Sequence, residues 1–240
     1  MVLLTGVAEI AKADFFYEST TGAPLKASAN FAVSGNNLIV TLTNTSSADV
    51  LVPANILTAL FFDVVGVGAL TPVSAVLGAG SSVVYDPDGQ PVGGVVGGEW
   101  AYGSGLAGAP RGATEGISSA GFGLFGNANF NGPDLSSPSA VNGMNYGILS
   151  FGDNFATDNG GIINAEGEIW YSVVFTLSGL PNNFVPSAAT ITGINFQYGT
   201  ALTEPNIDGG GGEAPEPISL ILLGSGLAGV GLYRRFRKSK

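Results

Sequence analysis

The sequence contains neither cysteine nor histidine, and positive charge is scarce. Without cysteine the protein has no disulfide, no thiol nucleophile and no zinc–thiolate site. Without histidine it lacks the commonest general base and the commonest transition-metal ligand. Only 8 Lys and Arg stand against 18 Asp and Glu, and the net charge of −10 excludes binding to nucleic acid through its phosphates.

Glycine is abundant instead, at 38 of 240 residues. With 45% hydrophobic residues the chain is too apolar to be a disordered acidic chain. No segment before residue 217 shows sustained helical periodicity, and turn sequences separate runs of apolar and β-branched residues. We therefore predict an all-β fold: a single antiparallel β-sandwich, jelly-roll-like, followed by a C-terminal single transmembrane helix.

The predicted strands begin with a hairpin of residues 27–33 and 38–45, joined by a four-residue loop at 34–37. The clearest strand is 168–177, a run of apolar, aromatic and β-branched residues between two glycines. Further strands are predicted at 57–65, 83–85, 98–102, 117–125, 146–151 and 191–198.

Charge is distributed unevenly along the chain. Residues 14–213 contain Lys26 and Arg111 as their only cations against 16 Asp and Glu, a formal charge of −14. Residues 214–240 carry five cations and one Glu, a formal charge of +4. An acidic body with a basic tail indicates a membrane or sorting function at one end.

An uncharged run of 16 residues, 218–233, precedes the basic tail. As a helix it would reach about 24 Å, slightly less than a bilayer's hydrocarbon core, and flanking Arg and Tyr extend that reach. The alternative, a buried C-terminal core helix, fits poorly with the cations that follow. The positive-inside rule places this stop-transfer cluster in the cytoplasm and the acidic body across the membrane. The cluster is Arg234, Arg235, Arg237, Lys238 and Lys240.

Pro215, Glu216 and Pro217 directly precede the apolar run, and four glycines at 209–212 form a flexible linker before them. This order of linker, Pro-Glu-Pro, apolar helix and basic cluster resembles the PEP-CTERM sorting signal of exosortase-dependent bacterial surface proteins. The resemblance implies processing near Pro-Glu-Pro by a membrane-embedded exosortase after export. Membrane insertion through 218–233 would then be transient.

Blocks of the body resemble the XDD-type members of this set of exosortase-dependent surface proteins. The resemblance implies that the protein is sent to the cell surface, and it implies no biochemical activity. The blocks are residues 37–46, 57–63, 99–102, 116–125 and 196–200.

Residues 1–13 end in Ala11-Lys12-Ala13, which fits a signal-peptidase site, with Ala11 and Ala13 at the recognised positions. The apolar stretch before it is short and has no basic region, so we expect the true start to lie upstream of Met1. The alternative is a first strand or helix of the domain. We divide the chain into a residual signal peptide (1–13), the β-domain (14–205), a Gly-rich linker (206–213) and the sorting signal (214–240).

Candidate sites in the body are few. Trp100 and Tyr102 share a face of a strand and could stack on a sugar ring, with core packing as the alternative. Asp86 and Asp88 resemble the start of a weak Ca²⁺ loop, with an ordinary turn as the alternative. Glu166 and Glu168 are a carboxylate pair, and a solvated strand edge is the simpler interpretation.

These observations favour a non-enzymatic protein without a cofactor. We expect it to be exported to the cell surface or extracellular matrix of a Gram-negative-type bacterium, with exosortase and, transiently, the membrane as partners. The alternative is a carbohydrate-binding module associated with extracellular polysaccharide.

Overall fold

The computed structural model describes residues 12–18, 25–85, 89–157, 162 and 167–211. These residues fold into β-strands joined by turns and short 3₁₀ helices, so the prediction of an all-β fold is confirmed. The strands are β1 (Lys12–Glu18), β2 (Lys26–Ser34), β3 (Asn37–Asn44), β4 (Leu57–Val64), β5 (Thr71–Leu77), β6 (Ser82–Val84), β7 (Ala101–Ser104), β8 (Glu115–Ser118), β9 (Ile148–Leu149), β10 (Glu168–Trp170), β11 (Ser172–Ser178), β12 (Ile191–Tyr198), β13 (Asn206–Asp208) and β14 (Gly210–Gly211). The 3₁₀ helices are η1 (Pro53–Asn55), η2 (Val92–Gly94), η3 (Gly97–Glu99) and η4 (Pro110–Gly112).

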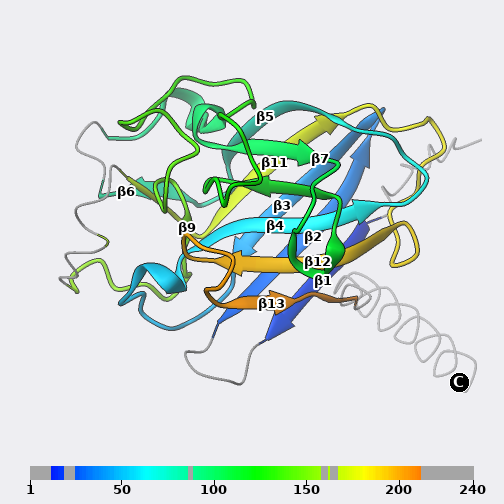
Figure 1. The fold of residues 1–240 in the computed structure, drawn as a ribbon. Coiled ribbons are helices and arrows are strands. Elements are labelled where there is room, and N and C mark those ends of the chain that lie inside the picture. The colour runs from blue at the N-terminus through cyan, green and yellow to red at the C-terminus, as the bar shows by residue number, and fades with distance from the viewer. Residues whose placement is uncertain (1–11, 19–24, 86–88, 158–161, 163–166, 212–240) are drawn as a thin grey trace, which may run out of the picture.

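The strands form two sheets (Figure 1). The first has the order β14-β1-β2-β3-β11-β5, and the second has the order β13-β12-β4-β9-β10-β6, with β8 and β7 joined to it through β4. Among the described strands β9 and β10 pair in parallel, which corrects the expectation of a purely antiparallel fold. The neighbours β1, β2 and β3 form a meander in one sheet, which departs from the paired Greek keys of a jelly roll.

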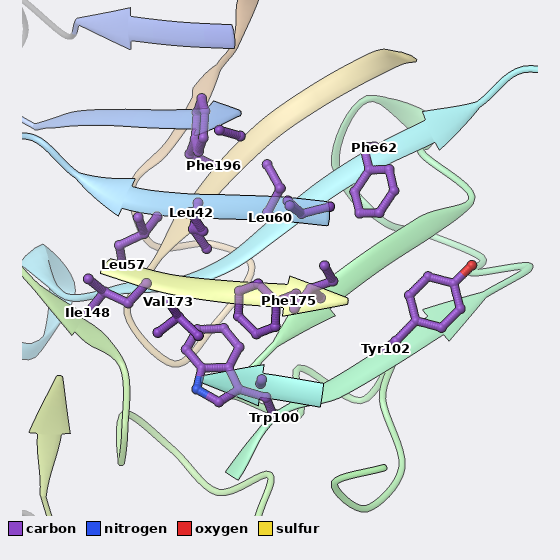
Figure 2. Close-up of a cluster of buried hydrophobic side chains, with 14 of the residues drawn as sticks. Leu42, Leu57, Leu60, Phe62, Trp100, Tyr102, Ile148, Val173, Phe175 and Phe196 are labelled. Atoms are coloured by element: carbon purple, nitrogen blue, oxygen red, sulfur yellow. The ribbon is translucent and has the colours of Figure 1, made fainter. Parts of the chain in front are cut away.

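The hydrophobic core lies between the two sheets and takes side chains from both (Figure 2). Alternation along β2 turns Ala27, Ala29 and Phe31 inward. Phe31 of the first sheet meets Phe62 of the second edge to face, with ring centroids 5.5 Å apart. Burial of these large rings is the main stabilising contribution that the sequence makes to the fold.

The predicted β2–β3 hairpin is present, but its loop is shorter than expected. Ser34 and Asn37 pair directly, so only Gly35 and Asn36 form the turn. Gly35 has φ of +60°, and a positive φ at the first of two loop residues is typical of a type II′ turn. Glycine adopts this φ without a steric penalty, which fixes the register of the two strands.

The run 168–177 is two strands instead of the one that we predicted. Tyr171 interrupts it with φ of +87°, a backbone conformation that a strand does not contain. As a result β10 belongs to the second sheet and β11 to the first. The chain therefore changes sheet at a single residue.

The folded domain extends beyond both of its predicted boundaries, residues 14 and 205. Ala13, the predicted end of a signal peptide, lies in β1 opposite Phe31 of β2. The predicted linker 206–213 contains β13, which pairs with β12, and β14, which pairs with β1. Five of its first six residues therefore belong to strands of the sheets.

Candidate functional site

Two loops at one end of the sheets hold each other through reciprocal hydrogen bonds. The Asp49 carboxylate accepts the Asn154 amide at 3.0 Å and the Thr157 hydroxyl at 2.8 Å. In return the Asp153 carboxylate accepts the Val50 amide at 2.9 Å. The loops 45–50 and 150–157 are therefore positioned by carboxylates that each loop offers to the backbone of the other.

An aromatic cluster lies on these loops and on the neighbouring strand β10. Phe151 stacks on Trp170 with ring centroids 5.8 Å apart and an interplanar angle of 19°. Phe155 meets Trp170 edge to face at 5.9 Å. Phe151 is 55% exposed and Phe155 is 46% exposed, which is unusual for rings of this size. Tyr171 and Tyr85 complete the aromatic cluster.

A hydrogen bond from its indole N–H holds the Trp170 side chain in place. Its Nε1–H donates to the backbone oxygen of Phe151 at 3.2 Å. The ring is thus fixed to the loop at its polar edge and stacked on Phe151 at its face. Such a fixed ring loses little conformational entropy when a ligand lies against it.

Buried acidic groups lie close to the aromatic cluster. Glu168 is 0% exposed, and neither of its carboxylate oxygens has a hydrogen-bond partner among the residues that the structure describes. Burial raises the pKa of Glu168 well above its usual range, and the negative Asp153 adds to the rise. The Glu168 carboxyl therefore keeps its proton to a higher pH than an exposed glutamate does.

The pKa values of Asp153 and Asp49 are shifted in opposite directions. Burial raises the pKa of Asp153 to about 6, and the neighbouring Asp49 adds to the rise. Hydrogen bonding from the Asn154 amide lowers the pKa of Asp49. Burial together with the charges of Asp153 and Asp49 raises the pKa of the Tyr85 hydroxyl to about 12. Asp49 therefore carries the more persistent negative charge at this site.

The described part of the chain contains no group of three or more acidic side chains arranged to hold a metal ion. Of the weak Ca²⁺ candidates, Asp86 and Asp88 lie outside the described residues. So does Glu166, the other half of the carboxylate pair with Glu168. The chemistry that the site offers is contact with exposed ring faces beside hydrogen-bond acceptors.

The structure places the predicted stacking pair in the core instead of on the surface (Figure 2). Trp100 is 0% exposed and lies edge to face against Phe175, with ring centroids 4.9 Å apart. Tyr102 is 6% exposed, and its hydroxyl accepts the Leu70 amide at 3.2 Å. Since neither ring has a free face, the core-packing alternative describes these two residues, and a sugar cannot stack on them in the folded domain.

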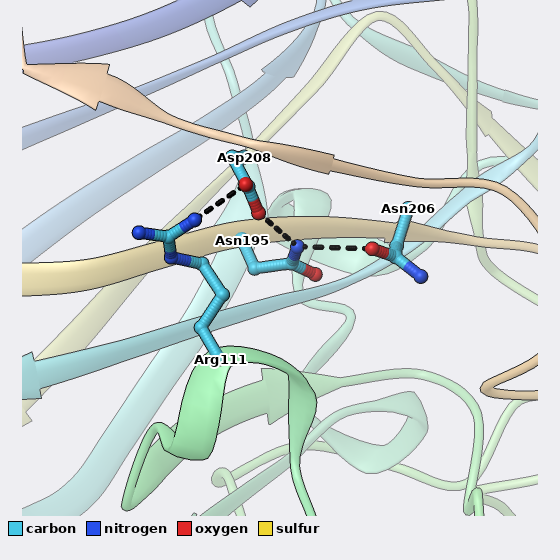
Figure 3. Close-up of polar contacts among 4 residues, drawn as sticks. All are labelled: Arg111, Asn195, Asn206 and Asp208. Carbon is cyan, nitrogen blue, oxygen red and sulfur yellow. Dashed lines mark hydrogen bonds and ion pairs between the residues drawn. The ribbon is translucent and has the colours of Figure 1, made fainter.

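Arg111, one of the two body cations, is bound to the C-terminal strand β13 (Figure 3). Its guanidinium forms an ion pair with Asp208, and the Asn195 amide donates to Asp208 at 3.0 Å and to Asn206 at 3.2 Å. These contacts fasten the end of the described chain to β12. Arg111 thus has a structural position in the described domain.

The predicted tail lies outside the described residues. This applies to Pro215, Glu216 and Pro217, to the apolar segment 218–233 and to the basic cluster at 234–240. Ala11 also lies outside them. Among the residues that the structure does describe, no helix is long and apolar enough to cross a membrane.

A family model for the PEP-CTERM protein-sorting motif matches residues 213–238. The chain carries a PEP-CTERM protein-sorting motif. The matched region begins two residues after β14 ends at Gly211, and it contains the Pro-Glu-Pro tripeptide, the apolar run and most of the basic cluster. The resemblance of the tail to this sorting signal is therefore confirmed. No curated protein and no solved structure matches the chain.

Proposed function

We propose that this protein is an exported surface or extracellular-matrix protein whose body has no enzymatic activity. The observation that carries the proposal is the sorting motif at 213–238, which follows the folded domain almost without a gap. In the precursor the segment 218–233 spans the membrane as a single helix, and the basic cluster stays in the cytoplasm. An exosortase then processes the chain near Pro215-Glu216-Pro217.

The arrangement of the body supports a non-enzymatic role. Its buried carboxyls are structural or isolated: Glu99 accepts the Ser136 hydroxyl at 2.8 Å, and Glu168 is enclosed away from solvent. A general acid or base must reach the proton that it transfers, and an enclosed group cannot. Asp49 and Asp153 are half-buried, and each has one carboxylate oxygen bonded to a backbone amide of the opposite loop.

Removal of the sorting motif should abolish processing. We expect the combined variant Pro215→Ala, Glu216→Ala, Pro217→Ala to remain at full length in the membrane, because the enzyme no longer finds its recognition segment. Mass spectrometry of the native C-terminus should show that the wild-type surface form lacks residues 218–240.

Two controls accompany this measurement. Deletion of the exosortase gene should reproduce the uncut form, and Thr203→Ala, an exposed change before the motif, should leave processing intact. A wild-type surface form that still carries residues 218–240 would contradict the proposal.

The aromatic cluster favours a second candidate function, binding to extracellular polysaccharide. The exposed faces of Phe151 and Phe155 suit the apolar face of a sugar ring, and Asp49 and Asn154 lie beside them with polar oxygens. This replaces Trp100 and Tyr102 as the aromatic residues that would carry such binding. Polysaccharides carry few charges or negative ones, so ring contacts suit them better than the body's sparse cations.

We expect Phe151→Ala and Phe155→Ala each to weaken retention on the organism's own polysaccharide. Loss of one ring contact, about 0.5–1.5 kcal/mol, corresponds to roughly a 2- to 10-fold weaker affinity. Val92→Ala is the matched control, since Val92 is 95% exposed and lies away from the aromatic cluster. Equal retention of all three variants would rule out a glycan site at the aromatic cluster.

A further inference from the structure

One end of the molecule has three loops without a charged residue, although Lys12 and the loop that contains Arg111 lie at the same end. We call it the terminal end and define it by three loops, residues 34–37, 65–70 and 179–190. None of these loops contains Asp, Glu, Lys or Arg, although residues 14–213 carry a formal charge of −14. A neutral surface of this extent on such an acidic body needs a physical reason.

The three loops form one continuous surface. The Asn36 side-chain amide donates to the Leu180 oxygen at 3.0 Å and to the Asn182 side chain at 2.9 Å, which joins the first loop to the third. The Val65 amide donates to the Thr190 oxygen at 2.9 Å, which joins the second loop to the third. The terminal end therefore presents its side chains together.

Apolar side chains project from the terminal end. Val65 is 53% exposed and Val185 is 56% exposed, and Phe184 between Asn183 and Val185 is half-buried. The opposite end of the sheets differs sharply, because its loops carry Asp49, Asp153 and Glu204. The two ends thus differ in charge, whereas exposed apolar side chains occur at both: Val65 and Val185 here, and Phe151 and Phe155 at the opposite end.

Both ends of the described chain emerge at the terminal end. Lys12 of β1 pairs with Ala32, two residues before the first loop, and Gly211 of β14 pairs with Phe15 of β1. Because β1 and β14 are antiparallel, the chain enters the fold and leaves it on the same side, about 10 Å apart along the strand direction. Figure 1 shows β1 in blue beside the last described residues.

The tail sets an upper limit on how far the terminal end can lie from the membrane. Ile218, the first residue of the predicted span, follows Gly211 by seven residues. An extended chain of that length reaches about 24 Å at most. The terminal end is therefore held close to the bilayer for as long as the tail is inserted.

We propose that the terminal end rests on the lipid bilayer surface in the inserted precursor, with Val65 and Val185 at the interface. This inference rests on the proposed function only for the insertion of residues 218–233. A neutral, apolar surface avoids the repulsion that an acidic surface meets at anionic lipids. The nearest acidic groups are Asp63, whose carboxylate accepts the Thr114 amide and hydroxyl, and Asp208, which is paired with Arg111.

This orientation also determines where the cleavage site and the aromatic cluster lie relative to the membrane. Cleavage near Pro-Glu-Pro takes place just beyond β14, beside the membrane that holds the processing enzyme. The Phe15–Gly211 pair precedes this cleavage point, so the sheet keeps it after processing. The aromatic cluster, at the opposite end, points away from the membrane into the extracellular space.

The absence of cysteine makes the test direct. Single variants Val65→Cys and Val185→Cys of the full chain are labelled with an environment-sensitive fluorophore. Val52→Cys and Val92→Cys are matched controls, because these valines are also exposed but lie elsewhere. Each protein is reconstituted into vesicles of phosphatidylethanolamine and phosphatidylglycerol that contain a nitroxide headgroup lipid as quencher.

We expect the labels at 65 and 185 to be quenched several-fold more strongly than those at 52 and 92. Equal quenching at all four positions, in protein that resists alkaline extraction, would overturn the inference and leave the sorting proposal intact. Protein that is extracted by alkali would overturn the membrane span itself. Disulfide-linked dimers of unlabelled Val185→Cys without lipid quenching would show that a second copy covers this surface, and would equally overturn the inference.

Discussion

Replacement of Glu168 by methionine should raise the free energy of unfolding at pH 8, and the gain should shrink as the pH falls. Glu168 is fully enclosed, and both of its oxygens lack a hydrogen-bond partner within the described residues. Methionine has a similar length and no polar atom, so it fills the same space without the cost of an unpaired buried group. That cost is about 1–3 kcal/mol for a neutral group and more for a charged one.

The direction of the pH effect follows from the raised pKa. Folding raises the pKa of Glu168 above 4.5, its ordinary value, chiefly through burial. Between the unfolded and the folded pKa, the folded state keeps a proton that the unfolded state has released. Stability therefore falls as the pH rises through this interval and is greatest below it.

Glu115 and Asp153 act in the same direction as Glu168. Burial raises the pKa of Glu115 to about 7. A hydrogen bond from Tyr102 lowers this pKa in part, and the negative charge of Asp63 raises it further. At 6% exposure Glu115 costs the fold at most about 3 kcal/mol at pH 8, from the difference between its two pKa values. Asp153 titrates lower, with a pKa of about 6. The wild-type protein should thus be more stable near pH 5 than near pH 8.

Urea unfolding at pH 5 and pH 8 measures the effect. Glu168→Met should reduce the difference in stability between the two pH values, whereas Asp134→Asn, which removes an exposed carboxylate, should change it far less. A wild-type protein that is more stable at pH 8 than at pH 5 would show that these carboxyls are solvated in solution.

Features set by local sequence were predictable. The β2–β3 hairpin follows from a glycine between two alternating runs, and β4 and β12 follow from their apolar and β-branched residues. The PEP-CTERM motif is a linear signal, so its residues alone identify it. Each of these depends on neighbours in the sequence, which is the information that a single sequence contains.

Features set by distant contacts were not predictable. Nothing around Tyr171 indicates that the chain leaves one sheet for the other there, because the two halves of the run have the same composition. β5 contains Pro72 and small residues, and it is a strand because β11 offers it an edge. β14 is two glycines whose only sign of strand structure is the partner β1.

The candidate site failed to appear in the sequence for the same reason. Phe151, Phe155 and Trp170 come together from a loop and a strand, and no spacing along the chain relates them. Trp100 and Tyr102, which do have the spacing of a shared face, use that face to fill the core. Periodicity identifies a common face, but only the fold decides whether it is the buried one.

Trp100→Ala should therefore destabilise the whole domain instead of removing a binding surface. Truncation of a buried aromatic ring costs about 3–5 kcal/mol, which is a large part of the 5–15 kcal/mol that a typical domain has. The ring centroid lies 4.9 Å from that of Phe175, so truncation leaves a cavity against β11 of the first sheet. Urea unfolding should show a clearly lower midpoint.

Trp100→Phe tests the contribution of the aromatic ring to stability separately from that of the indole N–H. The Nε1–H of Trp100 has no acceptor in the described part of the chain, so phenylalanine removes an unpaired donor together with part of the ring. We expect its cost to be well below that of alanine. Phe151→Ala, which truncates a ring that is 55% exposed, should cost less than either. Equal midpoints for Trp100→Ala and Phe151→Ala would place Trp100 outside the core.

The expected order of stability losses determines how the result of a polysaccharide-binding assay is interpreted. Loss of retention in Trp100→Ala would follow from unfolding and would say nothing about where a glycan binds. Loss of retention in Phe151→Ala at an unchanged unfolding midpoint would identify contact with the ring itself. Only the exposed aromatic cluster, whose rings can be truncated without removing the core, can distinguish a glycan-binding surface protein from one that is purely structural.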